Sequence, residues 1–300
     1  MNKRNYFICI GAVHSDYVLK LKQDYYKNRT NPINQQKNLG GVAYNIAKIL
    51  SFLNQNTKLY SLNCNILQKR EIRRQGIKFK SLNKEVNERY YTSILDKNGK
   101  MILGLADMDN YEKIIKHNLI ENYQNKKIIL DLNLSLDIIK DIINKNYQKN
   151  YICVCGTSAH KVYKINNFLN KIDTIILNKK ESLTLTKKKT IKEAMNYLIK
   201  KNKQLNIIIT NGKNSVNAYI NQQIYLSYPP SIKIFNENGA GDVLSAIFNY
   251  FYCCSYDALG SLTKSICAGS LQASGYKKNK EKYLQKLNNL SRSIKSKIAN

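Results

Sequence analysis

Residues 235–242 read Phe-Asn-Glu-Asn-Gly-Ala-Gly-Asp and lead directly into the apolar run VLSAIFNYF, which predicts a helix. Gly239, Ala240 and Gly241 let the backbone approach an anion without interference from large side chains. The unpaired N–H groups of a first helical turn would point at that anion. A carboxylate facing phosphates should be repelled, so we expect Asp242 to act on a proton, such as that of a hydroxyl attacking a phosphoryl group. The alternative is an ordinary helix start, in which Asp242 favours the helix dipole.

A second glycine-marked helix start lies far upstream, where residues 39–45 read Leu-Gly-Gly-Val-Ala-Tyr-Asn. Apolar residues follow at helical spacing. Asn45 is expected one turn into this helix, where its amide can hydrogen-bond a ligand. Two such sites suggest two ligands or two halves of one ligand. A Gly-Gly pair before an amphipathic helix is common, so the segment alone leaves a structural explanation open.

Composition restricts the class of protein. The 300 residues, 43% of them hydrophobic, can bury one large core, or one core with a small appended subdomain. No run of about 18 apolar residues is present, and the start MNKRNYFICIGAV lacks the length and cleavage site of a signal peptide. We therefore expect a soluble, cytoplasmic protein without a membrane partner. The cysteines lack paired C-x-x-C spacing and the histidines are scattered, so we expect reduced thiols and no metal site built from them.

The formal net charge is +29, from 49 Lys plus Arg against 20 Asp plus Glu. Such a charge is typical of nucleic-acid-binding proteins. The basic residues are spread along the chain, however, and no RNA-binding signature with stacking aromatics is present. Lys, Asn, Ile and Tyr have AT-rich codons, so biased mutation explains the charge without a polyanion. We expect no specific nucleic-acid partner. The alternative is an RNA-binding protein, whose RNA affinity would persist at high salt, unlike nonspecific attraction to the positive charge.

The order of apolar runs predicts the fold class. An apolar run at residues 6–11 is suited to a buried parallel strand. From about residue 112 strands and helices alternate, with strands predicted at 127–132, 151–155, 174–177 and 206–210 and a hairpin at 216–220 and 223–227. An amphipathic, lysine-rich segment beyond Tyr276 predicts a surface helix. The chain is therefore predicted to form an α/β fold, with a doubly wound, mostly parallel sheet flanked by helices.

Two separated segments predict a small β-sheet that stands off this core as a lid. Residues 16–21 alternate polar and apolar side chains, as do 89–95 and 101–105. The last two flank Asp96-Lys-Asn-Gly99, which is a tight hairpin signal. The lid is expected from about residues 12–38 and 86–110, within a single domain spanning 1–300. Because an exposed sheet can pair with another copy, a homodimer through the lid is an expected assembly.

With these elements laid out, the chain resembles the ribokinase-like (PfkB) family of carbohydrate and nucleoside kinases over roughly residues 6–275. The family pattern D-T-x-G-A-G-D corresponds to NENGAGD at residues 236–242. The pattern G-G-x-x-x-N-x-A is met at residues 40–47, N-x-x-E at Asn178 and Glu181, and T-x-G at Thr210 and Gly212. The resemblance implies a ribokinase-like fold and transfer of phosphate to an alcohol.

The resemblance also implies a role for each matched residue on the acceptor side. Asp242 would remove a proton from the sugar 5′-hydroxyl, and the amides of residues 239–241 would form an anion hole for the transferring phosphoryl group. Asp16 would accept hydrogen bonds from the ribose 2′ and 3′ hydroxyls. Three further residues would contact the substrate: Gly40, Gly41 and Asn45.

On the nucleotide side, the resemblance implies that ATP lies along Thr210 and Gly212. Asn178 and Glu181 would hold Mg²⁺ through water, which suits an ion that sheds its hydration reluctantly. A monovalent cation such as K⁺ is a further candidate cofactor. Taken singly, these residues are equally well explained as a strand end, a turn, a helix cap and a solvated helix charge. Their order and joint presence favour the functional interpretation.

Within the family, residues 90–109, YYTSILDKNGKMILGLADMD, look most like the lid hairpin of pseudouridine kinases. Residues 154–161, VCGTSAHK, resemble their Val-Asp-Pro-Val-Ser-Ala segment, with Cys155 and Gly156 in place of Asp and Pro. We therefore expect ATP-dependent phosphorylation of pseudouridine to pseudouridine 5′-phosphate. The alternative acceptors are ribose, another nucleoside or a fructose-type sugar.

Two departures from the family pattern favour a different class of protein. Glu237 replaces the family's Thr and would place an acid near the ATP phosphates. Residues 155–156 also differ from the family segment, with Cys and Gly in place of Asp and Pro. A degenerate, noncatalytic nucleoside-binding protein is therefore a second alternative. Lys161 is a candidate phosphate contact, but nothing in the sequence distinguishes it from the many other lysines.

Overall fold

The main body is built on one ten-stranded sheet. The computed structural model describes residues 6–87, 89–113, 121–255 and 257–299. The strands of this sheet are β1 (Tyr6–Ile10), β4 (Asn56–Ser61), β5 (Lys78–Ser81), β8 (Lys127–Asp131), β9 (Tyr151–Cys155), β10 (Thr174–Asn178), β11 (Asn206–Thr210), β12 (Val216–Ile220), β13 (Gln223–Ser227) and β14 (Ser296–Ala299). Their spatial order is β14-β13-β12-β11-β10-β9-β8-β1-β4-β5. The strands from β11 to β5 run parallel, and β12, β13 and β14 extend the sheet antiparallel.

Helices cover both faces of the sheet, which is why its parallel strands are apolar on both sides. In β1, Phe7 and Cys9 pack into one layer while Ile8 and Ile10 pack into the other, and all four side chains are fully buried. The first layer contains α1 (Val42–Phe52), α2 (Ile66–Arg74), α6 (Ala240–Ser255) and α7 (Ala258–Ala273), with α8 (Lys280–Ser291) outside them. The second contains α3 (Leu136–Asn146), the 3₁₀ segment η2 (Val162–Lys171), α4 (Lys179–Thr186) and α5 (Ile191–Lys201). The predicted α/β fold is confirmed.

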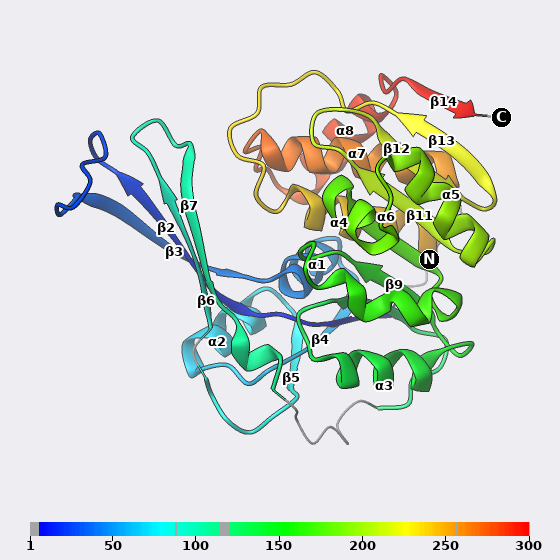
Figure 1. Cartoon of the computed structure of the whole chain (residues 1–300), viewed down its shortest axis with the longest axis horizontal. Helices are drawn as coiled ribbons and strands as arrows, with labels where there is room; N and C mark the ends of the chain where they lie inside the picture. The colour runs from blue at the N-terminus through cyan, green and yellow to red at the C-terminus, as the bar shows by residue number, and fades with distance from the viewer. Residues whose placement is uncertain (1–5, 88, 114–120, 256, 300) are drawn as a thin grey trace.

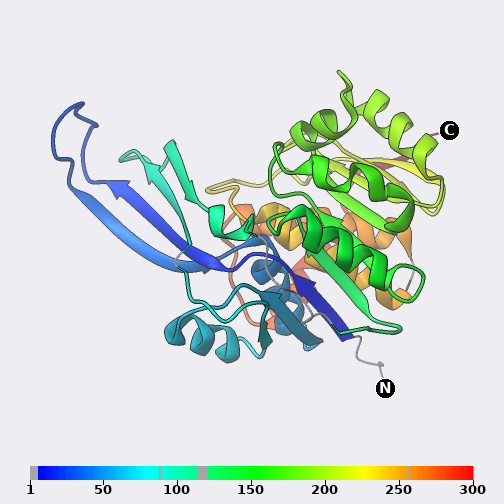
Figure 2. The ribbon, with the colours of Figure 1, turned by 60° about the horizontal axis from the view of Figure 1, so that its bottom comes forward.

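A separate four-stranded sheet, here called the lid, projects from the main body in both views (Figures 1 and 2). It consists of β2 (His14–Leu21), β3 (Ile33–Gly40), β6 (Tyr90–Leu95) and β7 (Met101–Asp107), in the order β3-β2-β6-β7. A short 3₁₀ turn, η1 (Asp109–Tyr111), follows it. The predicted hairpin is present: Gly99 has a φ of 90°, and its N–H donates to the Asp96 carbonyl at 3.0 Å. Glu88, inside the predicted lid range, lies outside the described residues.

The C-terminal segment differs in part from the prediction of one surface helix. α8 ends at Ser291, and the chain then forms β14 along β13. Without β14, β13 would be an edge strand with unpaired backbone groups, and the pairing satisfies them. The helical prediction is therefore wrong for residues 296–299, because an available sheet edge competes with the local helical pattern.

Two composition-based expectations can be compared with the structure. Cys9, Cys153 and Cys155 are buried within apolar strands, as predicted for all seven cysteines, but the prediction is wrong for Cys254, which is exposed near the end of α6. Across the described ranges, every helix is too short or too polar to traverse a bilayer.

Candidate active site

The candidate residues gather at one edge of the main sheet. Asp131, Asn178 and Thr210 each end a parallel strand, and the carboxyl ends of parallel strands lie at the same edge. The starts of α1 and α6 and the junction between β1 and the lid meet there too. In open α/β sheets ligands bind outside these carboxyl ends. This edge is therefore the candidate active site.

Asp242 and Asn45 are brought into direct contact. The side-chain amide of Asn45 donates to Oδ2 of Asp242 at 2.7 Å, which joins the first turns of α1 and α6. Burial raises the pKa of Asp242 from 3.8 to about 7. The hydrogen bond from Asn45 opposes this rise, whereas the nearby charges of Asp131, Asp16 and Glu181 add to it. A carboxylate with a pKa near neutrality is suited to act as a general base.

The turn before α6, predicted as an anion hole, depends on glycine at position 239. Gly239 has a φ of 74°, which a residue with a side chain rarely adopts. The Ala240 N–H donates to the Glu237 carbonyl at 3.2 Å, so one of the three predicted anion-hole amides is used within the turn. The Glu237 side chain is exposed. An exposed carboxylate is screened by water, which reduces its repulsion of a bound phosphate.

Asp16 and Gly40 fit against each other across β2 and β3. A Cβ atom on residue 40 would overlap the Asp16 carboxylate, so glycine is required there. Nε2 of His14 lies 2.9 Å from Oδ1 of Asp16. Nδ1 of His14 is buried and has no hydrogen-bond partner in the described part of the chain, and the buried Oδ1 of Asp16 makes no well-aligned hydrogen bond beyond its contact with His14. Buried polar atoms are normally satisfied, so this pair is suited to bind hydroxyl groups of a ligand.

Asp131 joins the end of β1 to the start of α1. Its Oδ2 accepts hydrogen bonds from the N–H groups of Ala12 and Ala43, at 2.8 and 3.1 Å. These bonds tie the end of β1 to the start of α1. Gly41 completes the crossing: its φ is 115°, and a Cβ there would overlap the Ala12 carbonyl oxygen. Glycine is therefore required at position 41 for steric reasons, and its contact with the substrate stays a prediction.

Asn178 and Glu181 form a capping box at the start of α4. The Asn178 side chain accepts from the Glu181 N–H at 2.9 Å, and the Glu181 carboxylate accepts from the Asn178 N–H at 2.8 Å. Burial raises the pKa of Glu181. Asn178 is aligned with Thr210 on the neighbouring strand, which places the predicted metal and nucleotide residues side by side. A Cβ on Gly156 would overlap the Glu181 carboxylate, which explains a glycine at that drifted position.

Comparison with known proteins identifies the family. The model for the pfkB family of carbohydrate kinases matches residues 4–274. The chain belongs to this family. It is therefore a carbohydrate kinase, an enzyme that transfers a phosphoryl group to an alcohol. No curated protein matches the chain.

Solved structures share the fold of this pfkB kinase at low sequence identity. A carbohydrate kinase from Agrobacterium tumefaciens superposes with a TM-score of 0.80 at 19% identity, covering 98% of this chain and 100% of that one. Ribokinase from Arabidopsis thaliana, complexed with ribose and ATP, gives 0.77 at 16% identity, with coverages of 95% and 99%. A tetrameric form of phosphofructokinase-2 from Escherichia coli gives 0.75 at 12% identity, with coverages of 96% and 99%. These likenesses confirm the ribokinase-like architecture with its small separate sheet.

Sequence reasoning missed three residues of this pfkB site. Asp131 was included in a predicted strand, and the signal that could have identified it is a lone acid at the end of an apolar run. His14 lies two residues before Asp16, and this spacing puts both on one face of a strand. Asn133 follows Asp131 by two residues and contacts Lys161. The other predicted residues, Gly212 among them, lie at the same edge; Gly212 has a φ of 57° and is exposed.

Proposed function

We propose that this kinase transfers the terminal phosphoryl group of ATP to a hydroxyl of a sugar or nucleoside, with Asp242 as the general base. The observation that carries the proposal is the Asp242 carboxylate at the glycine-marked start of α6, with a pKa of about 7. At neutral pH a large fraction of such a group is ionised and able to accept a proton. The anion-binding turn beside it suits the charge of the group in transfer.

On the acceptor side, the proposed diol contact is Asp16. Its buried Oδ1 contacts His14 but makes no well-aligned hydrogen bond within the described residues, and a carboxylate can receive hydrogen bonds from two hydroxyls. One N–H of the Asn45 amide donates to Asp242, which leaves the Asn45 carbonyl oxygen and the second N–H for substrate hydroxyls. Gly40 and Gly41 keep this region narrow and free of side chains.

On the nucleotide side, we propose that ATP lies along Thr210 and Gly212, next to Asn178 and Glu181. A buried carboxylate whose pKa is raised by burial is stabilised by a nearby cation, so Glu181 fits a metal ion that arrives with the nucleotide. The described residues contain no cluster of three or more His, Cys, Asp or Glu that could hold a metal. The site therefore fits Mg²⁺ that keeps water and phosphate ligands, and the ion would supply positive charge to the phosphates. K⁺ is a second candidate cofactor.

The proposed acceptor is pseudouridine, giving pseudouridine 5′-phosphate. Support comes from two segments whose sequences resemble those of pseudouridine kinases. One is the lid hairpin, which forms β6, β7 and η1, and the other is the segment after β9 that contains Ser158. The structure of the acceptor side is equally compatible with a free pentose, because pseudouridine and a pentose share the diol that Asp16 would bind.

Purified protein incubated with ATP, Mg²⁺ and a panel of acceptors tests this proposal. The panel contains pseudouridine, uridine, adenosine, ribose and fructose 6-phosphate, each with and without K⁺, and product is followed as ADP formed. We expect pseudouridine to have the highest kcat/KM. Good turnover of another acceptor without turnover of pseudouridine would reject the assigned substrate. No turnover of any acceptor, with nucleoside binding retained, would favour the noncatalytic alternative.

We also propose a homodimer formed through the lid. Four large apolar side chains of the edge strand β7 are about half exposed: Met101, Ile102, Leu103 and Leu105. The opposite edge strand, β3, has the mostly polar sequence INQQKNLG. An exposed apolar edge strand is a site for pairing with another chain. The asymmetry between the two edges therefore favours β7 as the face that meets a second copy.

A further inference from the structure

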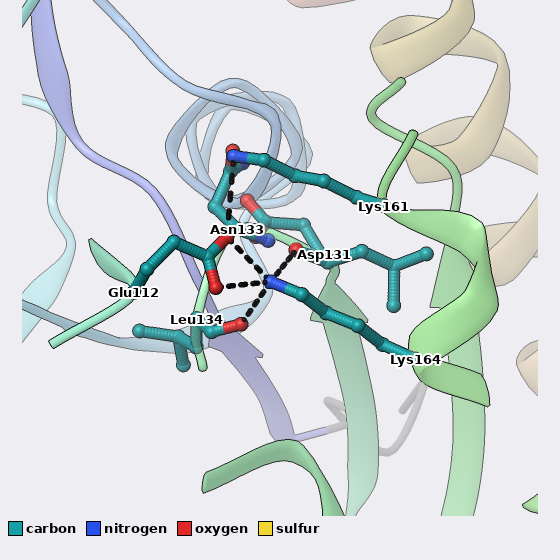
Figure 3. A network of polar contacts seen from close by, with 7 residues as sticks. Glu112, Asp131, Asn133, Leu134, Lys161 and Lys164 are labelled. Atoms are coloured by element: carbon teal, nitrogen blue, oxygen red, sulfur yellow. Dashed lines mark hydrogen bonds and ion pairs between the residues drawn. The ribbon is translucent and has the colours of Figure 1, made fainter. Parts of the chain in front are cut away.

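Two lysines beside the site have very different surroundings. Lys161 and Lys164 reach toward the same group of acceptors, formed by Glu112, Asn133 and the chain around Leu134 (Figure 3). The Lys164 ammonium is almost fully buried and has a full set of partners. It donates to both oxygens of Glu112 at 2.7 and 2.9 Å and to the carbonyls of Leu132 and Leu134 at 3.2 and 2.7 Å. Lys164 is therefore a structural ion-pair residue.

The Lys161 ammonium, in contrast, has fewer hydrogen-bond acceptors than it has protons to donate. Its side chain is 11% exposed, and within the described residues its hydrogen-bond acceptor is Oδ1 of Asn133, at 3.0 Å. Glu112 lies 3.9 Å away and already pairs with Lys164. An ammonium has three protons to donate, so two remain for a ligand. Burial and then the neighbouring Lys164 lower the pKa of Lys161.

The carboxylate of Asp131 is close enough to favour the charged form of Lys161, but the hydrogen bonds it makes go to backbone N–H groups. It already accepts three backbone N–H bonds, from Ala12, Ala43 and Asn133. Two ammonium groups thus share one directly paired carboxylate, that of Glu112. Buried charges are normally paired in direct contact, so an ammonium whose nearest carboxylate, at 3.9 Å, already pairs with another lysine is suited to bind an anionic ligand.

Two hydroxyl groups accompany Lys161 in the loop that follows β9. Oγ1 of Thr157 and Oγ of Ser158 are buried, and neither has a hydrogen-bond partner in the described ranges. The Lys161 N–H donates to the Ser158 carbonyl at 3.0 Å, so the loop turns back on itself and brings these residues together. Two hydroxyl donors and a cation form the donor set that phosphate oxygens accept from.

The loop lies between the two halves of the site. β9 is flanked in the sheet by β8, which carries Asp131, and by β10, which ends at Asn178. Gly156 lies against the Glu181 carboxylate on the proposed metal side, and Lys161 bonds Asn133 on the acceptor side. A group passing from nucleotide to acceptor would cross this point.

We propose that Lys161, with the hydroxyls of Thr157 and Ser158, binds the phosphoryl group in transfer, which is the terminal phosphate of the nucleotide before the reaction. This inference rests on the proposed function. In the step, the oxygen–phosphorus bond to ADP breaks, the bond from the acceptor oxygen to phosphorus forms, and the acceptor proton passes to Asp242. Lys161 forms no covalent bond and stabilises negative charge on the phosphoryl oxygens.

Equilibrium binding tests the assignment without turnover. The dissociation constants of a non-hydrolysable ATP analogue and of ADP are measured with Mg²⁺ for wild type and for Lys161→Met, by calorimetry. Because charge-assisted hydrogen bonds are strong, we expect roughly tenfold or greater weakening for the analogue and little change for ADP. Thr157→Ala and Ser158→Ala should raise the ratio of the two dissociation constants, analogue to ADP, by smaller factors. Lys140→Met, at an exposed position of α3, is the matched control for loss of one charge.

The outcomes separate this inference from the function on which it rests. Equal weakening for the analogue and ADP, or none in all three variants, would overturn it. If Lys161→Met weakened only the binding of an acceptor that carries its own phosphate, such as fructose 6-phosphate, the inference would also be overturned. Lys161 would then bind the phosphate of the acceptor. Should Lys161→Met fail to fold in a thermal melt, the two hydroxyl variants decide. If wild type phosphorylates no acceptor, the proposed function fails, while the analogue-to-ADP ratio still decides the role of Lys161.

Discussion

The side-chain amide of Asn45 donates a 2.7 Å hydrogen bond to the carboxylate of Asp242, across 197 residues of sequence. This bond joins the two glycine-marked helix starts, so that the proposed base and the acceptor-side helix form one unit. It also favours the charged form of Asp242, whereas burial and neighbouring carboxylates oppose that form. The balance of these effects sets the pH at which the base becomes ionised.

Replacing Asp242 with Asn should reduce kcat by about 10² to 10⁴, because general-base catalysis contributes factors of that size. Ligand binding should be retained, since Asn has nearly the same shape as Asp. Steady-state kinetics with the best acceptor of the panel, together with calorimetric binding of that acceptor, measures both effects. Unchanged phosphoryl transfer would show that Asp242 is not the base.

The same variant should be more stable than wild type at neutral and alkaline pH. The folded-state pKa of Asp242 is about 7 against an ordinary value of 3.8, so its ionised form opposes folding. This penalty is absent below the unfolded-state pKa, grows between the two values, and is complete above the folded-state pKa. Thermal melts at pH 8 should show a higher midpoint for Asp242→Asn, and the difference should vanish near pH 4. A wild-type midpoint equal to or above that of the variant at pH 8 would contradict the raised pKa.

Activity should fall on the acid side of pH 7. Below its pKa Asp242 carries a proton and cannot accept another, so kcat/KM should decrease by about tenfold per pH unit there and level off above pH 7. Asn45→Ala removes the hydrogen bond that lowers the pKa of Asp242. The acid limb of the profile, which is the range where kcat/KM falls with decreasing pH, should therefore move to higher pH. Asn34→Ala, at an exposed position of β3, is the control and should leave the limb in place. A limb that stays at the same pH in Asn45→Ala would show that the bond does not tune the base.

His14 should contribute to acceptor binding. Its Nε2 lies 2.9 Å from the Asp16 carboxylate, and its buried Nδ1 has no partner within the described residues. We expect His14→Ala to raise the acceptor KM by roughly 5- to 50-fold, the range for loss of one or two hydrogen bonds, while the KM for ATP stays constant. His14→Asn, which keeps a polar group, should restore part of the affinity. Lys20→Ala, exposed on the same strand, is the control; an equal rise in both KM values would indicate a structural role instead.

A charge on the apolar lid edge should prevent dimer formation. Leu103 is 47% exposed in β7, and a glutamate there would have to be desolvated in a paired edge. Light scattering should give a dimer for wild type and a monomer for Leu103→Glu. Gln36→Glu adds the same charge to the opposite edge strand β3 and should remain dimeric. A monomeric wild type at working concentration would remove the lid-mediated dimer.

Much of the architecture could be predicted because its signals are local. Short apolar runs bounded by polar residues predicted the parallel strands β1, β8, β9, β10 and β11, whose observed limits agree within one residue, whereas no bounds were predicted for β4 and β5. The turn at Asp96–Gly99 follows from glycine's access to positive φ. The pfkB resemblance was likewise carried by a few residues in fixed order, and the family match over residues 4–274 confirms it.

The sequence by itself determined the fold class, the family and the helix starts, since each depends on residues close together in the chain. Only the tertiary structure decided which distant groups meet: Asn45 with Asp242, His14 with Asp16, and Lys161 with Asn133. One lysine among 49 basic residues becomes distinctive only through its burial and its missing partners. The same holds for β14, whose local pattern favours a helix but which pairs with the free edge of β13. Burial, charge pairing and strand pairing are properties of contacts, and contacts exist only once the chain has folded.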